Sequence, residues 1–229
     1  AKELGVRLVV CIDEFQQIGE FPDSLSIQKR LRGVWQHHQN VSYCFFGSKK
    51  HLMENIFQSR RMPFYQFGEM LHLECIPTEY WVPFICSRFE KYGKHISKEY
   101  ATRICEIVKN YSSYVQQLAW NVMAETEKEV DEDCLQNGIN TLLQQCSSLF
   151  IQQTEGLTTY QLNFIRLLCN DIHSGFTVQS IADTYPLGSK SNIERIKKAL
   201  ENREIITTTK DGVFLADCVF ELWFKKEMM

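Results

Sequence analysis

The stretch that decides the fold is Leu8-Val9-Val10-Cys11-Ile12-Asp13-Glu14, close to the first residue of the sequence. Apolar and β-branched residues fill its first part without alternation, which is typical of a strand buried on both faces of a parallel sheet. Two carboxylates follow directly. The stretch therefore predicts a central strand that carries Asp13 and Glu14 to the carboxyl edge of a sheet, where α/β proteins bind their ligands.

Two further apolar runs predict the neighbours of this strand: VSYCFFG at residues 41–47 and the shorter MLHLEC at residues 70–75. Between them, apolar side chains recur at helical spacing over residues 25–39 and 49–58, which indicates two amphipathic helices. Strand, helix, strand, helix and strand in this order favour a parallel α/β sheet.

After Pro77 the apolar side chains change to a helical period and keep it through residue 154. We expect four helices here: residues 78–92, a helix capped by Ser97, a helix capped by Ser112 or Ser113, and a long helix from about Asp133 to Phe150. This part of the chain is predicted to be all-helical.

The last part of the sequence predicts three helices, at residues 159–171, 177–185 and 189–203, and then two β-rich runs around Lys210-Asp211-Gly212. An Asp-Gly pair between such runs is a strong hairpin signal, and three helices followed by a hairpin are typical of a winged helix-turn-helix. A final helix is expected at residues 217–226. The predicted fold class is α/β followed by mostly α, with domains at residues 1–76, 77–154 and 155–229.

Composition excludes several classes of protein. The 25 basic and 28 acidic residues give a net charge of -3, so there is no global attraction to nucleic acid or to an anionic membrane. No apolar run approaches the roughly 20 residues that span a bilayer. The nine cysteines form no CxxC pair, and we interpret them as small apolar residues of a reducing cytoplasm.

The run LVVCIDE resembles the Walker B motif of AAA+ and STAND ATPases. The order of IDEFQ, FFGSKKHLMENIF, YSSYVQQLA and ADCVFELWF resembles the archaeal-type ATPases of prokaryotes, over nearly the whole chain. The resemblance implies a P-loop sheet, a helical lid and a C-terminal winged helix, with ATP and Mg²⁺ as ligands.

The same resemblance implies roles for three residues. Asp13 would hold Mg²⁺ through water, and Glu14 would polarise the water that attacks the γ-phosphate. Ser48, just after the second strand, would be the polar residue called sensor 1; its alternative role is to cap the next helix. Arg60 and Arg61 are either an arginine finger or a solvated basic turn.

One part of the family pattern is missing. A phosphate-binding Walker A loop needs G-x-x-x-x-G-K-[ST], and none of the eleven glycines fits that pattern. We therefore expect the chain to be an ATPase that lacks its N-terminal Walker A portion and does not hydrolyse ATP alone. The strand at residues 70–75 is then expected to be displaced, exposed at an edge, or paired with another chain.

Five cations of the predicted winged helix could contact nucleic acid phosphates: Lys190, Arg195, Lys197, Lys198 and Lys210. Acidic residues offset part of this charge, so a protein partner is an equal alternative. Two functions remain open. The chain is either part of a nucleotide-driven molecular switch or a DNA- or protein-binding adaptor with a degenerate ATPase domain, and a homo-oligomer is compatible with both.

Overall fold

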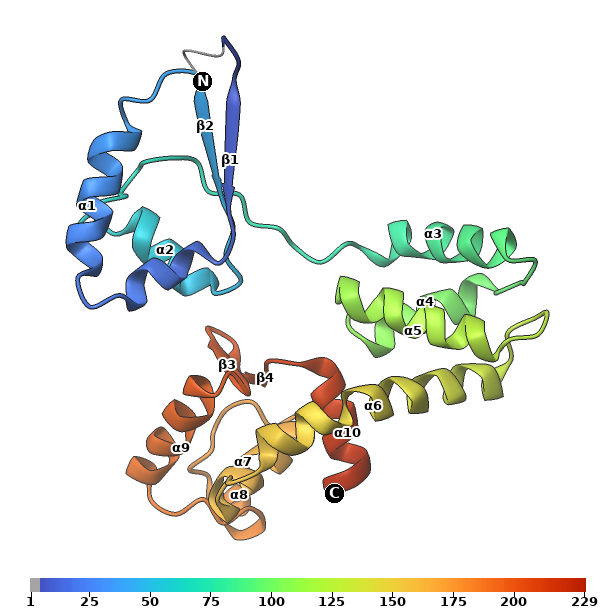
Figure 1. Cartoon of the computed structure of the whole chain (residues 1–229). Helices are drawn as coiled ribbons and strands as arrows, with labels where there is room; N and C mark the ends of the chain where they lie inside the picture. Colours follow the sequence, from blue (N-terminus) through green and yellow to red (C-terminus); the bar gives the residue numbers. More distant parts are fainter. Residues whose placement is uncertain (1–4) are drawn as a thin grey trace. The chain divides into compact units, whose positions relative to one another are not determined.

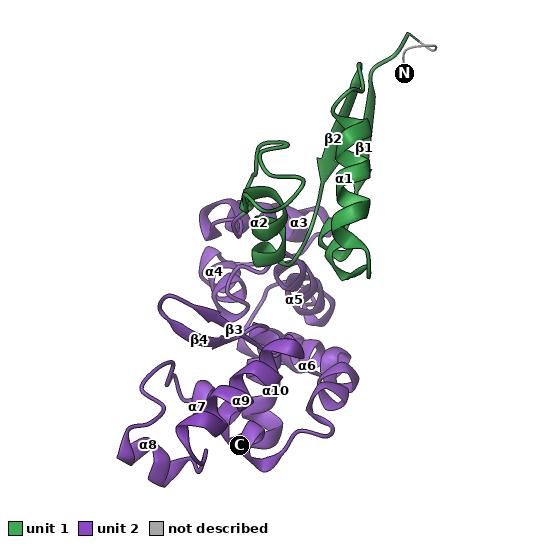
Figure 2. Cartoon of the chain, turned by 90° about the vertical axis from the view of Figure 1, so that its left-hand side faces the viewer, with its two compact units in different colours: residues 1–73 green, residues 74–229 purple. Residues whose placement is uncertain are grey.

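The computed structural model describes residues 5–229 (Figure 1). The chain divides into two compact units, of which the first ends at Leu73 and the second runs from Glu74 to Met229 (Figure 2). No helix among the described residues is long and apolar enough to cross a membrane.

The first unit is built on a parallel pair of strands. β1 (Leu8–Ile12) pairs with β2 (Val41–Phe45) in a register that sets Leu8 opposite Val41 and Ile12 opposite Phe45. A 3-10 helix, η1 (Phe15–Glu20), and helix α1 (Ser24–Trp35) follow β1, and α2 (Lys50–Gln58) follows β2. The predicted parallel pair and the helix after each strand are confirmed.

Aromatic residues fill the small core of this unit. Its buried members are Phe15, Ile18, Ile56, Phe57 and Phe64. Trp35 of α1 stacks on Tyr43, with ring centroids 4.7 Å apart, so α1 covers the face of β2 from which Tyr43 points. Arg32 Nη1 donates to the carbonyl oxygens of Pro63 and Tyr65, at 2.8 and 2.9 Å, which fastens the segment after α2 to α1.

Two expectations about the sheet are wrong. Strand β1 is exposed instead of buried on both faces, with Val9 64% and Leu8 39% accessible. Residues 70–75 lie in no helix or strand, and Leu73 is 95% exposed. The reason is the same in both cases, because within the described residues this sheet contains only β1 and β2. A two-stranded sheet is too small to cover the side chains of a further apolar run. The exposure of Leu71 and Leu73 agrees with the expectation that residues 70–75 are displaced or exposed, and the strand conformation expected for them is wrong.

The register makes a prediction about two thiols. Cys11 and Cys44 are opposite each other, both are exposed, and register partners in a sheet point to the same face. Adjacent strands lie about 4.8 Å apart, within the roughly 4.4–6.8 Å between Cα atoms that a disulfide spans. We expect mild oxidation with diamide to join them, detected as a Cys11–Cys44 peptide by mass spectrometry.

Cys75 is the control for that experiment, since it is exposed but lies outside both strands. Oxidation that joins Cys75 to Cys11 or Cys44 as readily as it joins these two to each other would contradict the parallel register.

The second unit begins with four helices: α3 (Thr78–Lys91), α4 (Lys98–Ile107), α5 (Ser112–Glu125) and α6 (Glu132–Thr154). The predicted cap at Ser97 is confirmed, since its hydroxyl accepts from the Tyr100 amide at 3.2 Å. The predicted cap of α5 is wrong. Ser112 already has helical geometry, and Tyr111 occupies the cap position without a side-chain hydrogen bond.

Three helices and a hairpin follow: α7 (Thr159–Cys169), α8 (Gln179–Thr184), α9 (Lys190–Asn202), β3 (Ile206–Thr209) and β4 (Gly212–Leu215). The expected antiparallel hairpin is confirmed, with Thr209 opposite Gly212. Gly212 has φ 143°, and a Cβ there would lie 2.6 Å from the His173 oxygen. The position needs glycine because the hairpin also binds His173 through the Val213 amide, at 3.0 Å.

The last helix, α10 (Cys218–Met228), joins the two halves of this unit. Its cap residue Asp217 contacts Tyr114 of α5, Glu221 contacts Lys109 in the turn between α4 and α5, and Trp223 contacts Ser147 of α6. Residues from Trp81 to Phe224 form one continuous apolar core. Residues 77–154 and 155–229 therefore pack together, and their division into two domains at residue 154 stays a prediction.

Candidate functional site

The carboxyl ends of β1 and β2 lie at the same edge of the sheet because the strands are parallel. The backbone contacts continue past both ends: the Phe46 amide donates to the Ile12 oxygen at 2.9 Å, and the Phe15 amide donates to the Phe46 oxygen at 2.8 Å. These bonds set the residues after β1 beside the residues after β2.

The structure brings Glu14 and Ser48 together, although 34 positions separate them. The Ser48 hydroxyl donates to Glu14 Oε2 at 3.2 Å. Glu14 has a left-handed backbone conformation, with φ 48°, and its amide donates to Asp13 Oδ1 at 2.8 Å. A carboxylate pair and a hydroxyl thus share one edge of the sheet, with Asp13 exposed and Glu14 half-buried.

Sequence reasoning missed a fourth residue, Gln16. It is only 2% exposed, and its Nε2 donates to the same Glu14 oxygen that accepts from Ser48. Gly47 lies against it, since a Cβ at that position would come 2.2 Å from Gln16 Oε1. The only signal in the sequence is the IDEFQ stretch itself, which shows neither the burial of Gln16 nor its partner.

The two arginines after α2 are not brought into this group. Arg60 and Arg61 are both exposed, in the irregular segment that follows Gln58. Within residues 5–229 neither forms a hydrogen bond with Glu14 or Ser48. The arginine-finger role stays a prediction.

The five predicted cations of α9 and the hairpin differ in their surroundings. Lys190, Arg195, Lys198 and Lys210 are exposed, and Arg195 donates to Asn192 Oδ1 at 2.7 Å. Lys197 is half-buried and pairs with Glu194 at 3.4 Å. The cations are therefore accessible at four of the five positions, and a neighbouring carboxylate offsets the fifth.

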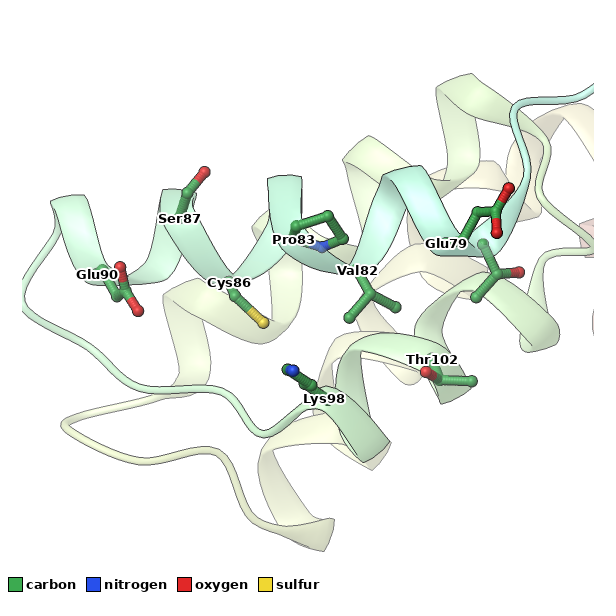
Figure 3. Close-up of a pocket in the computed structure, with 9 residues that line it drawn as sticks. Glu79, Val82, Pro83, Cys86, Ser87, Glu90, Lys98 and Thr102 are labelled. Atoms are coloured by element: carbon green, nitrogen blue, oxygen red, sulfur yellow. The ribbon is translucent and has the colours of Figure 1, made fainter.

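A separate groove lies between α3 and α4, with a volume of about 630 Å³. In Figure 3 the Cys86 thiol and the Lys98 side chain point into the gap between the two helices. Pro83 and Val82 add apolar surface, and Glu79 and Glu90 add carboxylates. None of the residues predicted from the sequence to form a site lines this groove.

Comparison with solved structures shows which class of protein has this fold. A Walker-type ATPase of Pyrococcus abyssi superposes over 98% of this chain with a TM-score of 0.72, at 12% sequence identity. The ORC2 protein of Aeropyrum pernix, in its ADPNP-ADP complexes, superposes over 97% with a TM-score of 0.55 at 14% identity. The chain thus has an AAA+ ATPase-like fold over most of its length.

A third similar structure is the RuvB Holliday junction branch migration motor of Thermotoga maritima, with a TM-score of 0.50 over 95% of this chain and 14% identity. The chain spans 64%, 66% and 68% of the lengths of the Pyrococcus, Aeropyrum and Thermotoga chains, respectively. No protein-family model and no curated protein sequence matches the chain.

Proposed function

We propose that the chain forms part of an ATP-dependent molecular switch of the AAA+ and STAND kind. The observation that carries the proposal is the hydrogen bond between Ser48 and Glu14, at 3.2 Å. It places a hydroxyl and a carboxylate, from the ends of two adjacent parallel strands, where an α/β sheet binds nucleotide phosphates. The similarity to the Walker-type ATPase of Pyrococcus abyssi supports the same conclusion at the level of the fold.

The three residues divide the chemistry of phosphoryl transfer to water. Asp13 would hold Mg²⁺ through water, Glu14 would orient and polarise the attacking water, and Ser48 would contact the γ-phosphate or that water. The exposed Asp13 carboxylate suits Mg²⁺, which keeps several waters and takes one or two carboxylates together with phosphate oxygens. Mg²⁺ would neutralise charge on the phosphates when it is bound.

Tight phosphate binding also needs backbone amides that wrap the phosphates and a lysine that reaches them. No G-x-x-x-x-G-K-[ST] pattern occurs in the 229 residues. We infer that hydrolysis depends on a Walker A loop that these residues do not supply. In this proposal residues 77–154 act as the lid and residues 155–229 as the winged helix. The apolar core that the two share supports a second unit that transmits the nucleotide state.

The alternative is a winged-helix adaptor whose ATPase part no longer binds nucleotide. The accessible cations Lys190, Arg195, Lys198 and Lys210 favour it, because phosphate contacts of this kind give salt-dependent DNA binding. A protein partner on the same surface is equally compatible with the mixed charge of α9.

Calorimetry with Mg²⁺-ATP tests the proposal, on this chain and on a form of it joined to a segment that carries a Walker A loop. We expect weak or undetectable binding by the chain alone, because it has no phosphate-wrapping loop, and binding in the micromolar range by the joined form. Glu14→Gln should then lower turnover by at least about 100-fold while leaving ATP binding intact.

Gln17→Glu is a matched control for that substitution, since Gln17 is exposed and lies three positions from Glu14. It should leave both binding and turnover unchanged. If neither form binds Mg²⁺-ATP, the switch is excluded and the adaptor function is favoured.

A further inference from the structure

Two donors converge on one oxygen of Glu14. The Ser48 hydroxyl reaches Oε2 from the end of β2, at 3.2 Å, and the Gln16 amide reaches the same oxygen from the first turn of η1. Hydrogen bonds to a charged acceptor are about twice as strong as neutral ones. The Glu14 carboxylate is therefore bound by one donor that follows β2 and one donor in η1. The left-handed backbone of Glu14 turns the chain into η1, so that Gln16 comes back to this carboxylate.

The burial of Gln16 makes its bond to Glu14 more important than a surface contact. Only 2% of Gln16 is exposed, and its Oε1 has no hydrogen-bond partner among the described residues. Turning the amide over would set that oxygen against the Glu14 carboxylate, where two acceptors repel. This repulsion fixes the orientation of the Gln16 amide. The unpartnered Oε1 costs about 1–3 kcal/mol, and the hydrogen bond from Nε2 to Glu14 offsets that cost.

Gly47 provides the space in which the amide lies. A Cβ on Gly47 would come 2.2 Å from Gln16 Oε1 and 2.7 Å from Met53 Sδ. Any side chain at position 47 would push Gln16 away from Glu14. The glycine just before Ser48 thus serves the packing of Gln16, and its φ is not one that requires glycine.

We propose that Gln16 is a positioning residue. It holds the Glu14 carboxylate in the orientation in which Oε2 also accepts from the Ser48 hydroxyl. The inference rests on the proposed function, in which Glu14 polarises the attacking water. With Oε2 occupied by two donors, Oε1 of Glu14 is the oxygen left to accept a proton from water. Loss of the Gln16 amide would let the carboxylate rotate among its rotamers, since a half-buried glutamate has several of similar energy.

The first test is independent of nucleotide. Side-chain scalar couplings of Glu14, measured by NMR on the whole chain, should report a single rotamer in the native protein. In Gln16→Met, which keeps length but removes the amide, we expect averaged couplings, while the Phe15 amide stays protected through its bond to the Phe46 oxygen. Gln17→Met, at the exposed neighbour, should leave the couplings native.

Gly47→Ala reaches the same contact from the other side and covers the case in which Gln16→Met does not fold. It should also give averaged Glu14 couplings. A single native rotamer in either folded variant would overturn the positioning role. In a form that turns over Mg²⁺-ATP, Gln16→Met should lower kcat about 10-fold with KM unchanged.

The two proposals fail in different ways. Absence of nucleotide binding in every form, together with averaged couplings in Gln16→Met, would overturn the proposed function and leave the restraint on Glu14 in place. Turnover of Mg²⁺-ATP by the form joined to a Walker A segment, with an unchanged kcat in its Gln16→Met variant, would leave the proposed function and overturn the role of Gln16.

Discussion

Gly138→Ala should destabilise the second unit by about 2 kcal/mol or more, although alanine is normally the better helix residue. Gly138 lies inside α6, and a Cβ there would come 2.6 Å from Val122 Cγ2 and 2.9 Å from the Val122 backbone nitrogen. The backbone nitrogen belongs to α5 and cannot rotate away. The two helices would have to separate, and the interior packing around the fully buried Leu118 and Leu142 would loosen.

Urea unfolding followed by circular dichroism measures this effect, and for a unit of this size the loss corresponds to a fall in Tm of about 4–8 °C. Gly33→Ala is the matched control, because Gly33 also lies inside a helix and a Cβ there meets nothing within 4 Å. It should stabilise α1 by about 0.5–1 kcal/mol. If Gly138→Ala lowers the free energy of unfolding no more than Gly33→Ala does, the close approach of α5 and α6 is excluded.

Local features of this fold could be predicted from the sequence because their causes are local. The cap at Ser97 depends on a hydroxyl that meets an amide three positions along the chain, and it is confirmed; the hydroxyl of Ser189 caps α9 in the same way. The hairpin was predicted from the turn residues around Gly212, and it forms. The structure refines it, because the two connecting residues are Lys210 and Asp211 and the glycine begins β4.

Burial could not be predicted in the same way. The apolar run at Leu8 to Ile12 indicated a strand covered on both faces, yet whether a strand is covered depends on what packs against it elsewhere in the chain. Residues 70–75 illustrate the same limit, since their alternation of apolar residues indicates a strand only if a neighbouring strand is present. In the described residues no third strand joins β1 and β2.

The candidate site lies between these two cases. Asp13 and Glu14 follow from an apolar strand that ends in two carboxylates, and Ser48 follows from the resemblance to AAA+ and STAND ATPases. The structure sets Ser48 on Glu14; the chemical roles of all three stay predictions. Gln16 could not be found, because its contact with Glu14 depends on the left-handed turn at Glu14 and on the space beside Gly47. Neither is visible in the residue types alone.

The second large effect is expected at Asp217, which serves two helices at once. Its Oδ1 accepts from the amides of Val219 and Phe220, at 2.7 and 3.0 Å, at the start of α10. Its Oδ2 accepts from the Tyr114 hydroxyl of α5 at 2.5 Å. Burial, and then the hydrogen bond to this carboxylate, raise the pKa of Tyr114 far above its usual range, so the phenol is a donor at neutral pH.

Asp217→Ala should therefore cost about 2–4 kcal/mol, the sum of a lost helix cap and a half-buried hydroxyl without its partner. Tyr114→Phe should cost only about 1 kcal/mol, because the cap remains and the Asp217 Oδ2 that loses its donor is on a half-buried residue open to water. The double variant should be no less stable than Asp217→Ala alone, since removing the hydroxyl removes the stranded group. Urea titrations of all four proteins give the coupling directly, and strictly additive losses would mean that α5 and α10 are not joined through this pair. A large coupling is expected because Asp217 binds Tyr114 of α5 and caps α10 with the same carboxylate.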